Sequence, residues 1–478
     1  MSRSGEDPGA MGSTASQGLE ERYLEFNAKS APAFVRYPQV EPLRLFIFKE
    51  LLVQRRADRP QDSVKHWLRP LLRRARTRLV GCRADVLIWL ENEREVMVDA
   101  LLPIQRALAA RDIGVDLVSC GKLRNLPVAR RVFRFPARAV RPEWARGAWE
   151  ALSACEEGLR DRALGRSFYH ACAMLQGLYD ELHTLLDAAR PKVVLSASTR
   201  AIGGAALTMA SQLHGITSLV LQHGMQGAVY APVLADLMLT WGASSDEILL
   251  SAGVPRASLL AVGSPRHDAM KPSGNGVARS ALLRALALPE LPTFVFFSQG
   301  NDPVATGEAA AESARWLEET AAQYANALNV VVRLHPNEDG ALYRHRPHLT
   351  VMSRAVELAI ALEGCDWFGS IFSTVLYDGL LYGKQAWQFH ADHWPVPAFN
   401  WRQGLARRVA SQRQFSEMVR HVLSQGSPCE VDEALVARVF ANRGRATEAV
   451  VDVVASCLNL PAASLEAHAA ATTNGSGE

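Results

Sequence analysis

The sequence has no apolar run long enough to cross a bilayer, which takes roughly 18–20 consecutive apolar residues. Its first segment, MSRSGEDPGAMGSTASQGLEER, lacks the apolar core of a secretory signal. We therefore expect a cytoplasmic location. The formal net charge is only +3 in 478 residues, a balance that does not favour nucleic acid as a partner.

Cysteine is also scarce, with seven residues that are scattered along the chain and form no C-x-x-C pair. This pattern argues against a disulfide framework or a zinc site and suits free thiols in a reducing compartment. The sequence contains no D-x-D, G-x-S-x-G or G-x-G-x-x-G motif. We expect neither a metal ion nor a cofactor.

The length exceeds what one hydrophobic core usually holds, so two domains are expected. The predicted segments are an N-terminal extension (1–82), a first domain (83–262), a polar linker and hinge (263–292), a second domain (293–460) and a disordered tail (461–478). The extension contains a basic amphipathic stretch at 64–80. This stretch either contacts an anionic membrane surface or packs as a solvated helix on its own domain.

Short apolar runs alternate with helical periodicity in both halves of the chain. The predicted strands are 85–91, 114–119, 192–198, 216–224 and 236–242 in the first half, and 293–300, 329–336, 349–353, 365–370 and 385–390 in the second. This β-α-β order predicts an α/β protein with two doubly wound parallel sheets, each covered by helices on both faces.

Open α/β sheets bind ligands at the carboxyl ends of their strands, so polar residues that follow predicted strands are candidates for a site. The stretch VLQHGMQGAVY (220–230) ends an apolar run in a histidine flanked by glycine and glutamine. Such an ending suits a side chain presented to a ligand, and a satisfied buried histidine is the alternative. The first-half candidates are Glu91, Glu93, Ser196 to Arg200, Gln222, His223, Gly224 and Arg266.

In the second half, Ser373 and Thr374 stand where a strand turns into a helix. Hydroxyls and backbone N–H groups at the positive end of a helix dipole can bind phosphate, and simple N-capping is the alternative. The RLHP stretch ends another strand of the same sheet, so we expect His335 at a strand end neighbouring Ser373 and Thr374. The second-half candidates are Gln299, Gly300, Arg333, His335, Pro336, Ser373 and Thr374.

Two further stretches carry weaker signals. GLLYGK (379–384) lacks the spacing of a phosphate-binding loop and lies at the end of a predicted helix, so we reject it as such a loop. HADH (390–393) has histidines three apart, but Trp394 and Pro395 crowd them, and a loop is the better interpretation.

Together, QHG at 222–224, GSPR at 263–266, HP at 335–336 and ST at 373–374 with the downstream YDGLLYGK resemble the GT-B glycosyltransferases of bacterial surface-polysaccharide synthesis. The pattern is similar to capsule and lipopolysaccharide enzymes of the Kdo- and sialyltransferase type, and to CDP-glycerol glycerophosphotransferases. The resemblance covers roughly 85–390 and implies two Rossmann-like domains that face each other across a cleft. The D/E-D/E-G motif of sialyltransferases has no clean counterpart, which puts sialic acid in doubt.

The resemblance also implies roles for individual residues. His335, Ser373 and Thr374, with Arg333 beside them, would bind the phosphate of a cytidine-nucleotide donor, and Asp378 is a loose match to the acidic residue that meets the ribose. The catalytic base would come from the first domain, as His223, Glu91 or Glu93.

The implied activity is metal-independent transfer of a sugar from a nucleotide-sugar, with a CMP-sugar such as CMP-Kdo favoured, to a capsule- or lipopolysaccharide-type acceptor. The acceptor would be a glycan or a lipid-linked molecule, with a peripheral contact at the cytoplasmic face of the inner membrane. A CDP-glycerol-type transferase, a UDP-GlcNAc 2-epimerase-like enzyme and a non-catalytic glycan-assembly module remain as alternatives.

Overall fold

The computed structural model describes residues 19–54, 84–91, 95–119, 130–132, 142–274, 276–299, 307–335, 338–353, 355–394, 399–426 and 431–459. The chain divides into two compact units. The larger unit comprises Phe26–Pro272 and Val431–Glu478, and the smaller unit comprises Met1–Glu25 and Ser273–Glu430. The predicted helix at 64–80 and the predicted tail at 461–478 lie outside the described residues. A search of the described helices finds none with the length and apolar character of a membrane span.

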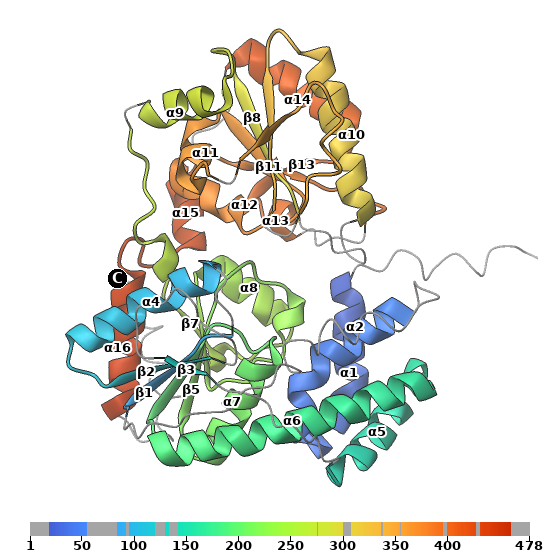
Figure 1. Cartoon of the computed structure of the whole chain (residues 1–478), viewed down its shortest axis with the longest axis vertical. Helices are drawn as coiled ribbons and strands as arrows, with labels where there is room; N and C mark the ends of the chain where they lie inside the picture. Colours follow the sequence, from blue (N-terminus) through green and yellow to red (C-terminus); the bar gives the residue numbers. More distant parts are fainter. Residues whose placement is uncertain are drawn as a thin grey trace, which may run out of the picture. The chain divides into compact units, whose positions relative to one another are not determined.

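The larger unit is built on a sheet of seven described strands, all parallel, in the order β3-β2-β1-β4-β5-β6-β7 (Figure 1). The strands are β1 (Val86–Trp89), β2 (Val115–Ser119), β3 (Arg130–Val132), β4 (Val193–Ser196), β5 (Thr217–Leu221), β6 (Leu237–Thr240) and β7 (Leu259–Ala261). Strands β1, β4, β5 and β6 are buried along their whole length, as expected for strands covered on both faces. The sequence pattern predicted the central strands and missed the short strands β3 and β7.

Helices connect and cover these strands. Before residue 273 they are α1 (Leu19–Arg36), η2 (Pro38–Leu43), α2 (Arg44–Gln54), α4 (Glu95–Ala110), α5 (Trp144–Cys155), η3 (Glu157–Arg160), α6 (Arg162–Ala189), α7 (Ile202–Leu213), η4 (Ala228–Tyr230), α8 (Ala243–Ser251), η5 (Arg256–Ser258) and η6 (Pro265–His267). The N-terminal extension predicted from the sequence is therefore helical over its described part.

The end of the chain returns to the larger unit through α15 (Glu433–Val439) and α16 (Ala446–Asn459). Helix α16 lies beside α4 (Figure 1), and Val450 and Val454 share one apolar core with Ile104 and Leu108. This differs from the predicted second domain of 293–460. The difference arises because the apolar face of α16 packs into the core of the first sheet. The position of α16 in the sequence, after the second sheet, does not reveal this packing.

The smaller unit holds a second parallel sheet of six described strands in the order β10-β9-β8-β11-β12-β13. The strands are β8 (Thr293–Phe297), β9 (Asn329–Arg333), β10 (Thr350–Met352), β11 (Trp367–Ser370), β12 (Ala386–Phe389) and β13 (Ala406–Val409). The helices are α9 (Val277–Leu286), α10 (Gly307–Gln323), α11 (Leu358–Gly364), α12 (Val375–Asp378), η7 (Gly379–Tyr382), α13 (Phe399–Arg402) and α14 (Gln412–Gln425).

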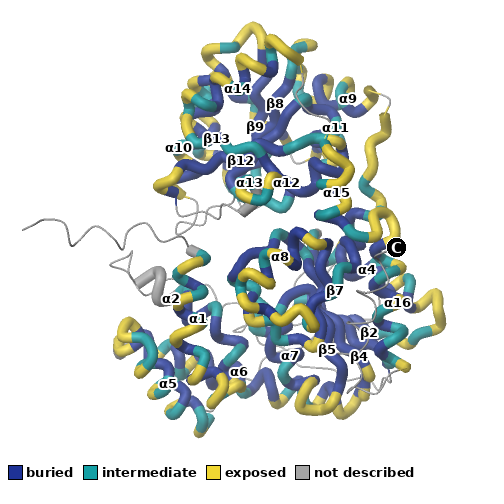
Figure 2. Tube along the Cα trace, turned by 180° about the vertical axis from the view of Figure 1, so that it is seen from behind, coloured by how far each residue is buried: buried dark blue, intermediate teal, exposed yellow. Residues whose placement is uncertain are grey.

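Aromatic side chains fill much of the core of the smaller unit, and Figure 2 shows its central strand β8 in the dark blue of buried residues. The ring centroid of Phe389 lies 5.0 Å from those of both Phe296 and Phe415. Contacts at this spacing add to the apolar burial of each ring. The apolar runs predicted as strands from the sequence thus form a tightly packed sheet.

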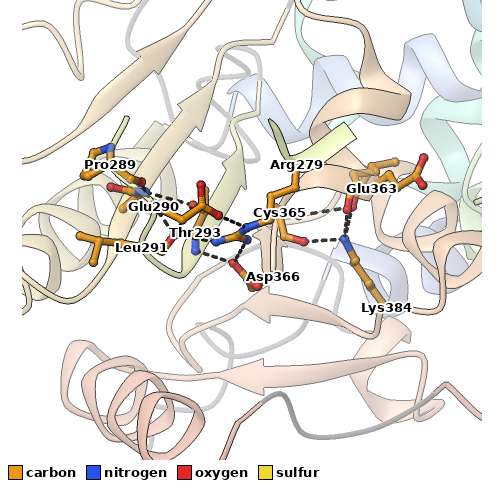
Figure 3. Close-up of polar contacts among 11 residues, drawn as sticks. Arg279, Pro289, Glu290, Leu291, Thr293, Glu363, Cys365, Asp366 and Lys384 are labelled. Atoms are coloured by element: carbon orange, nitrogen blue, oxygen red, sulfur yellow. Dashed lines mark hydrogen bonds and ion pairs between the residues drawn. The ribbon is translucent and has the colours of Figure 1, made fainter. Parts of the chain in front are cut away.

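The segment predicted as a polar linker, 263–292, contains η6 and α9, and α9 packs against α11 in the smaller unit. Figure 3 shows the polar contacts that hold its end. Arg279 donates to a carboxylate oxygen of Asp366 at 2.7 Å, and that oxygen also accepts the backbone N–H of Thr293 at 2.7 Å. The described residues of the predicted linker therefore include a helix and a set of polar contacts next to the first residue of β8.

Lys384, the lysine of GLLYGK, has a structural role at the end of α11 (Figure 3). Its ammonium group donates to the backbone carbonyls of Leu362 at 2.6 Å, Glu363 at 2.7 Å and Cys365 at 2.5 Å. These are the carbonyls that a helix C-terminus leaves without intrahelical partners. The lysine is thus used by the fold, in agreement with our rejection of this stretch as a phosphate-binding loop.

We predict that Glu363 makes stability depend on pH. Burial alone would raise the pKa of its carboxyl, but bonds from the hydroxyl and N–H of Ser273, the N–H of Gly274 and the nearby Lys384 together lower that pKa. A lowered folded-state pKa stabilises the fold above the carboxyl's ordinary pKa of 4.5, and the contribution is lost as pH falls through the folded value.

Denaturant unfolding at pH 6 and pH 3.5 checks this prediction. Glu363→Gln should lower the free energy of unfolding at pH 6 and have a smaller effect at pH 3.5. Glu319→Gln, an exposed position on α10, is the control. An equal effect of Glu363→Gln at both pH values would contradict the assignment.

Candidate functional site

The order of the strands reverses once in each sheet, between β1 and β4 in the larger unit and between β8 and β11 in the smaller unit. Doubly wound sheets bind ligands at the carboxyl edge beside such a reversal, because the connections diverge there to opposite faces. Many of the candidate residues predicted from the sequence follow these strands or their neighbours.

His223 follows β5 at the carboxyl edge of the larger unit and is partly buried. Its Nδ1 donates a hydrogen bond to the backbone carbonyl of Ala197, which follows the adjacent strand β4. A carbonyl oxygen can only accept, so Nδ1 carries the proton and the lone pair of the neutral ring is on Nε2. Tyr230 stands edge-on to the imidazole, with the ring centroids 6.5 Å apart. This is the tautomer that a general base acting through Nε2 requires.

The two residues that flank His223 hold the backbone at this edge. Gln222 is buried, and its amide accepts the N–H of Trp241 at 2.7 Å and donates to the carbonyl of Gly224 at 2.9 Å. The Trp241 indole donates in turn to the Gln222 carbonyl at 2.9 Å. Gln222 therefore connects the end of β5 to the end of β6, and we assign it a structural role in place of the predicted ligand contact.

Glu91 follows β1, and its carboxylate lies at the start of α7. One carboxylate oxygen accepts the backbone N–H of Gly204 at 3.0 Å and the indole N–H of Trp89 at 2.7 Å. Hydrogen bonds to a carboxylate favour its charged form and reduce its strength as a base. Glu91 thus stabilises a helix N-terminus, while Glu93 lies outside the described residues.

Gly204 is required for this arrangement, and we predict that Gly204→Ala destabilises the larger unit. A Cβ at this position would stand 2.0 Å from the carbonyl oxygen of Ser198. Overpacking of this kind costs about 1–3 kcal/mol or more. Thermal unfolding checks the prediction, with Gly307→Ala as the control because a Cβ there meets nothing within 4 Å. An unchanged melting temperature for Gly204→Ala would contradict the packing.

Two arginines also lie in this part of the larger unit. Arg266 is partly buried in η6, next to His267, whose ring packs against Trp241 with the centroids 5.0 Å apart. Arg200 follows β4, and its guanidinium lies 4.6 Å from the ring centroid of Tyr230. The sequence pattern placed Arg200 at a strand end without a role, and it gave no signal for Tyr230.

In the smaller unit, β8 lies between β9 and β11, so His335 and Ser373 do not follow adjacent strands as predicted. Ser298 follows β8, the strand between the two. Its hydroxyl accepts the backbone N–H of His335 at 2.8 Å, which connects the end of β8 to the end of β9. Glu338 accepts the same N–H at 2.9 Å and also accepts the Ser298 hydroxyl. Glu338 was not among the residues predicted from the sequence, where its only signal was its position three residues after the histidine.

Glu338 also lines a cavity of about 380 Å³ in the smaller unit. The cavity lies between the start of α10 and the segment that follows β9, lined by Gly307, Ala310, Glu338, Asp339, Gly340, Ala341 and Leu342. Its volume is within the range of small-ligand pockets.

Ser373 and Thr374 are partly exposed at the start of α12. Thr374 is the N-cap residue but makes no side-chain capping bond, and the Ser373 hydroxyl accepts only a long bond of 3.4 Å from the N–H of Val375. Simple N-capping therefore does not account for the two hydroxyls. Gln299, after β8, contacts the hydroxyl of Ser370 at 3.4 Å, so the ends of β8 and β11 are joined at this edge.

The other residues predicted to bind the nucleotide donor have different environments. Arg333 donates to the carbonyl of Val356 at 2.5 Å, a contact on the β10 side of the sheet. Asp378 is buried with 1 % of its surface exposed and already interacts with other groups of the fold, so we do not carry it into the site. Gly300 and Pro336 lie outside the described residues.

The HADH stretch does not gather ligands for a metal ion. His393 contacts a carboxylate oxygen of Glu312 at 3.0 Å, and Trp394 donates to the same oxygen at 2.7 Å. Asp392 pairs with Arg408. The described part of the chain contains no group of three or more His, Cys, Asp or Glu side chains with the geometry of a metal site.

The sequence matches no family model and no curated protein. The UDP-GlcNAc 2-epimerase from Methanocaldococcus jannaschii is similar in structure, with a TM-score of 0.51 at 12% identity over 78% of this chain and 99% of that chain. MnaA from S. aureus, solved with UDP, is similar with a TM-score of 0.52 at 13% identity over 78% and 97%.

A third solved structure is the wall teichoic acid polymerase TagF, with a TM-score of 0.45 at 10% identity over 92% of this chain and 98% of that chain, and at that score it supports no conclusion. The two likenesses above 0.5 show the fold: two Rossmann-like units of the GT-B type, as the sequence predicted.

Proposed function

We propose that this protein is a glycosyltransferase that moves a sugar from a nucleotide-activated donor to a hydroxyl group of a glycan or lipid-linked acceptor. The observation that carries the proposal is the state of three side chains at the carboxyl edges. His223 has the tautomer of a general base, and Ser373 and Thr374 present hydroxyls that helix capping does not use. A base for the acceptor and donors for the leaving phosphate are the parts that direct displacement needs.

In this proposal the smaller unit binds the donor. The hydroxyls of Ser373 and Thr374 donate to the phosphate of the nucleotide, Gln299 contacts it from the end of the adjacent strand β8, and His335 contacts it from the end of β9, one strand further away. Arg333, the last residue of β9, contributes positive charge from the β10 side of the edge. The negative charge of the leaving nucleotide is met by these groups without a bound metal ion.

The larger unit supplies the base. His223 takes the proton of the acceptor hydroxyl on Nε2 while the Ala197 carbonyl stabilises the imidazolium that forms. Glu91 is a weaker candidate, because its carboxylate already accepts two hydrogen bonds at the start of α7. Gly224, beside His223, gives the acceptor room to approach.

The resemblance to capsule and lipopolysaccharide enzymes favours a cytidine donor, a CMP-sugar such as CMP-Kdo, with CDP-glycerol as the variant of the same chemistry. The acceptor would then be a capsule- or lipopolysaccharide-type glycan, reached from the cytoplasm with a peripheral contact at the membrane. Thermal-shift measurements with CMP, CDP, UDP and GDP identify the nucleotide, because a bound ligand raises apparent stability by mass action.

A UDP-GlcNAc 2-epimerase-like activity is a second candidate, because solved structures of such enzymes share the fold. The sequence lacks the set of paired carboxylates that this reaction uses. Incubation with UDP-GlcNAc alone separates the two functions, since an epimerase needs no acceptor. Conversion of UDP-GlcNAc without acceptor would overturn the transferase proposal.

We predict that His223→Asn abolishes most turnover and leaves the fold intact. The asparagine amide can still donate to the Ala197 carbonyl in place of Nδ1, but it offers no base at the position of Nε2. The rate should fall by about 10²–10⁴-fold, the typical contribution of a general base. Turnover and the melting temperature are measured together, and wild-type turnover would exclude His223 as the base.

We predict that the double variant Ser373→Ala and Thr374→Ala binds nucleotide at least about tenfold more weakly, since each hydrogen bond to a charged group contributes about 1.5–3 kcal/mol. Calorimetry with the nucleotide chosen from the thermal-shift screen measures the loss. Ser424→Ala, an exposed serine near the end of α14, is the matched control. Unchanged affinity in the double variant would place the donor elsewhere.

A further inference from the structure

Arg200 is a partly exposed cation at the carboxyl edge of the larger unit. Its side chain forms no ion pair with any described residue, and its Nε is buried without a hydrogen-bond partner. A buried guanidinium N–H without an acceptor is unfavourable unless a ligand supplies one. The fold itself therefore does not explain why an arginine occupies this position.

The guanidinium is held in place by its neighbours. It lies 4.6 Å from the ring centroid of Tyr230, and the same ring stands edge-on to His223. The backbone N–H of Arg200 donates to the hydroxyl of Ser198 at 3.2 Å. Arg200 and His223 thus both contact the aromatic ring of Tyr230.

Two more polar side chains at this edge lack partners. The hydroxyl of Ser196, the last residue of β4, is buried with no hydrogen-bond partner. Gln226 stands between His223 and Tyr230 in the sequence. The oxygen and nitrogen of its side-chain amide are also buried without hydrogen-bond partners, and the residue is only 1% exposed. Buried polar groups without partners are unfavourable, and their occurrence where the adjacent strands β4 and β5 end indicates groups kept for a ligand.

We propose that Arg200, Ser196 and Gln226 form the acceptor subsite and that the acceptor carries an oxyanion, a phosphate or a carboxylate, next to the hydroxyl that reacts. Arg200 binds the oxyanion, and Ser196 and Gln226 bind hydroxyl groups beside it. The identification as an acceptor subsite rests on the proposed function, because it takes His223 as the base, whereas the anion site itself is independent of it.

Binding of simple anions to the full chain tests the site. The background is the Ser373→Ala and Thr374→Ala double variant, which removes the phosphate-binding hydroxyls of the smaller unit. Inorganic phosphate and acetate are titrated separately by calorimetry. We expect one of them to bind, and binding of phosphate alone or of acetate alone identifies the class of oxyanion.

Arg200→Gln should weaken that binding at least about tenfold, while Arg166→Gln, an exposed arginine on α6, should not change it. The melting temperature of Arg200→Gln should be close to that of the wild type, because the Arg200 side chain forms no ion pair with a described residue and its Nε has no hydrogen-bond partner. A structural arginine would instead lower it. Failure of both anions to bind, or equal binding by Arg200→Gln, overturns the proposal.

Turnover separates this proposal from the proposed function. Arg200→Gln should raise the KM for the acceptor and leave the KM for the donor unchanged. If the wild type binds no nucleotide but does bind the anion at Arg200, the transferase proposal is wrong and the proposal of an anion site remains. A raised donor KM in Arg200→Gln would contradict its place on the acceptor side.

Discussion

Parallel pairing is the constraint on which the rest of this structure depends. Every described strand pairs in parallel with its neighbours, so within each sheet all carboxyl ends lie at one edge. The central strands β1, β4, β5 and β6 of the larger unit are buried along their whole length, which disfavours charged side chains there. Polar groups of these strands therefore gather where the strands end, and the reversal of strand order fixes which ends meet a ligand.

The polar residues at these edges fall into two groups by their hydrogen bonds. Gln222, Glu91 and Glu338 bind backbone N–H groups of neighbouring segments and hold the loops in place. In the second group, the Thr374 hydroxyl makes no capping bond and the buried Nε of Arg200 has no hydrogen-bond partner. The hydrogen bonds of the first group hold the loops that carry the second group. Such loops must be rigid, because a catalytic or binding side chain has to be placed to within a fraction of an ångström.

Much of the fold could be predicted from the sequence, since runs such as TFVFF at 293–297 and VLIW at 86–89 are recognisable as buried strands without knowledge of their neighbours. The return of α16 to the larger unit could not be predicted, because its amphipathic face would suit either sheet. The site was predicted less completely. In the sequence, Gln222 and His223 are both polar residues that follow a strand. Only the hydrogen bond from the backbone N–H of Trp241 distinguishes Gln222, which has a structural role, from His223, the candidate base.

The sequence by itself determined the α/β class, the central strands of two doubly wound sheets and the short list of polar strand ends, because periodicity and burial are local properties of the chain. The tertiary structure decided the tautomer of His223 and the hydrogen bond that the Glu91 carboxylate accepts at the start of α7. It also decided that β8 lies between β9, which His335 follows, and β11, which Ser373 follows. It further decided that the Nε of Arg200 is buried without a hydrogen-bond partner. These features depend on contacts between segments far apart in the chain, whose geometry exists only once the sheets have formed.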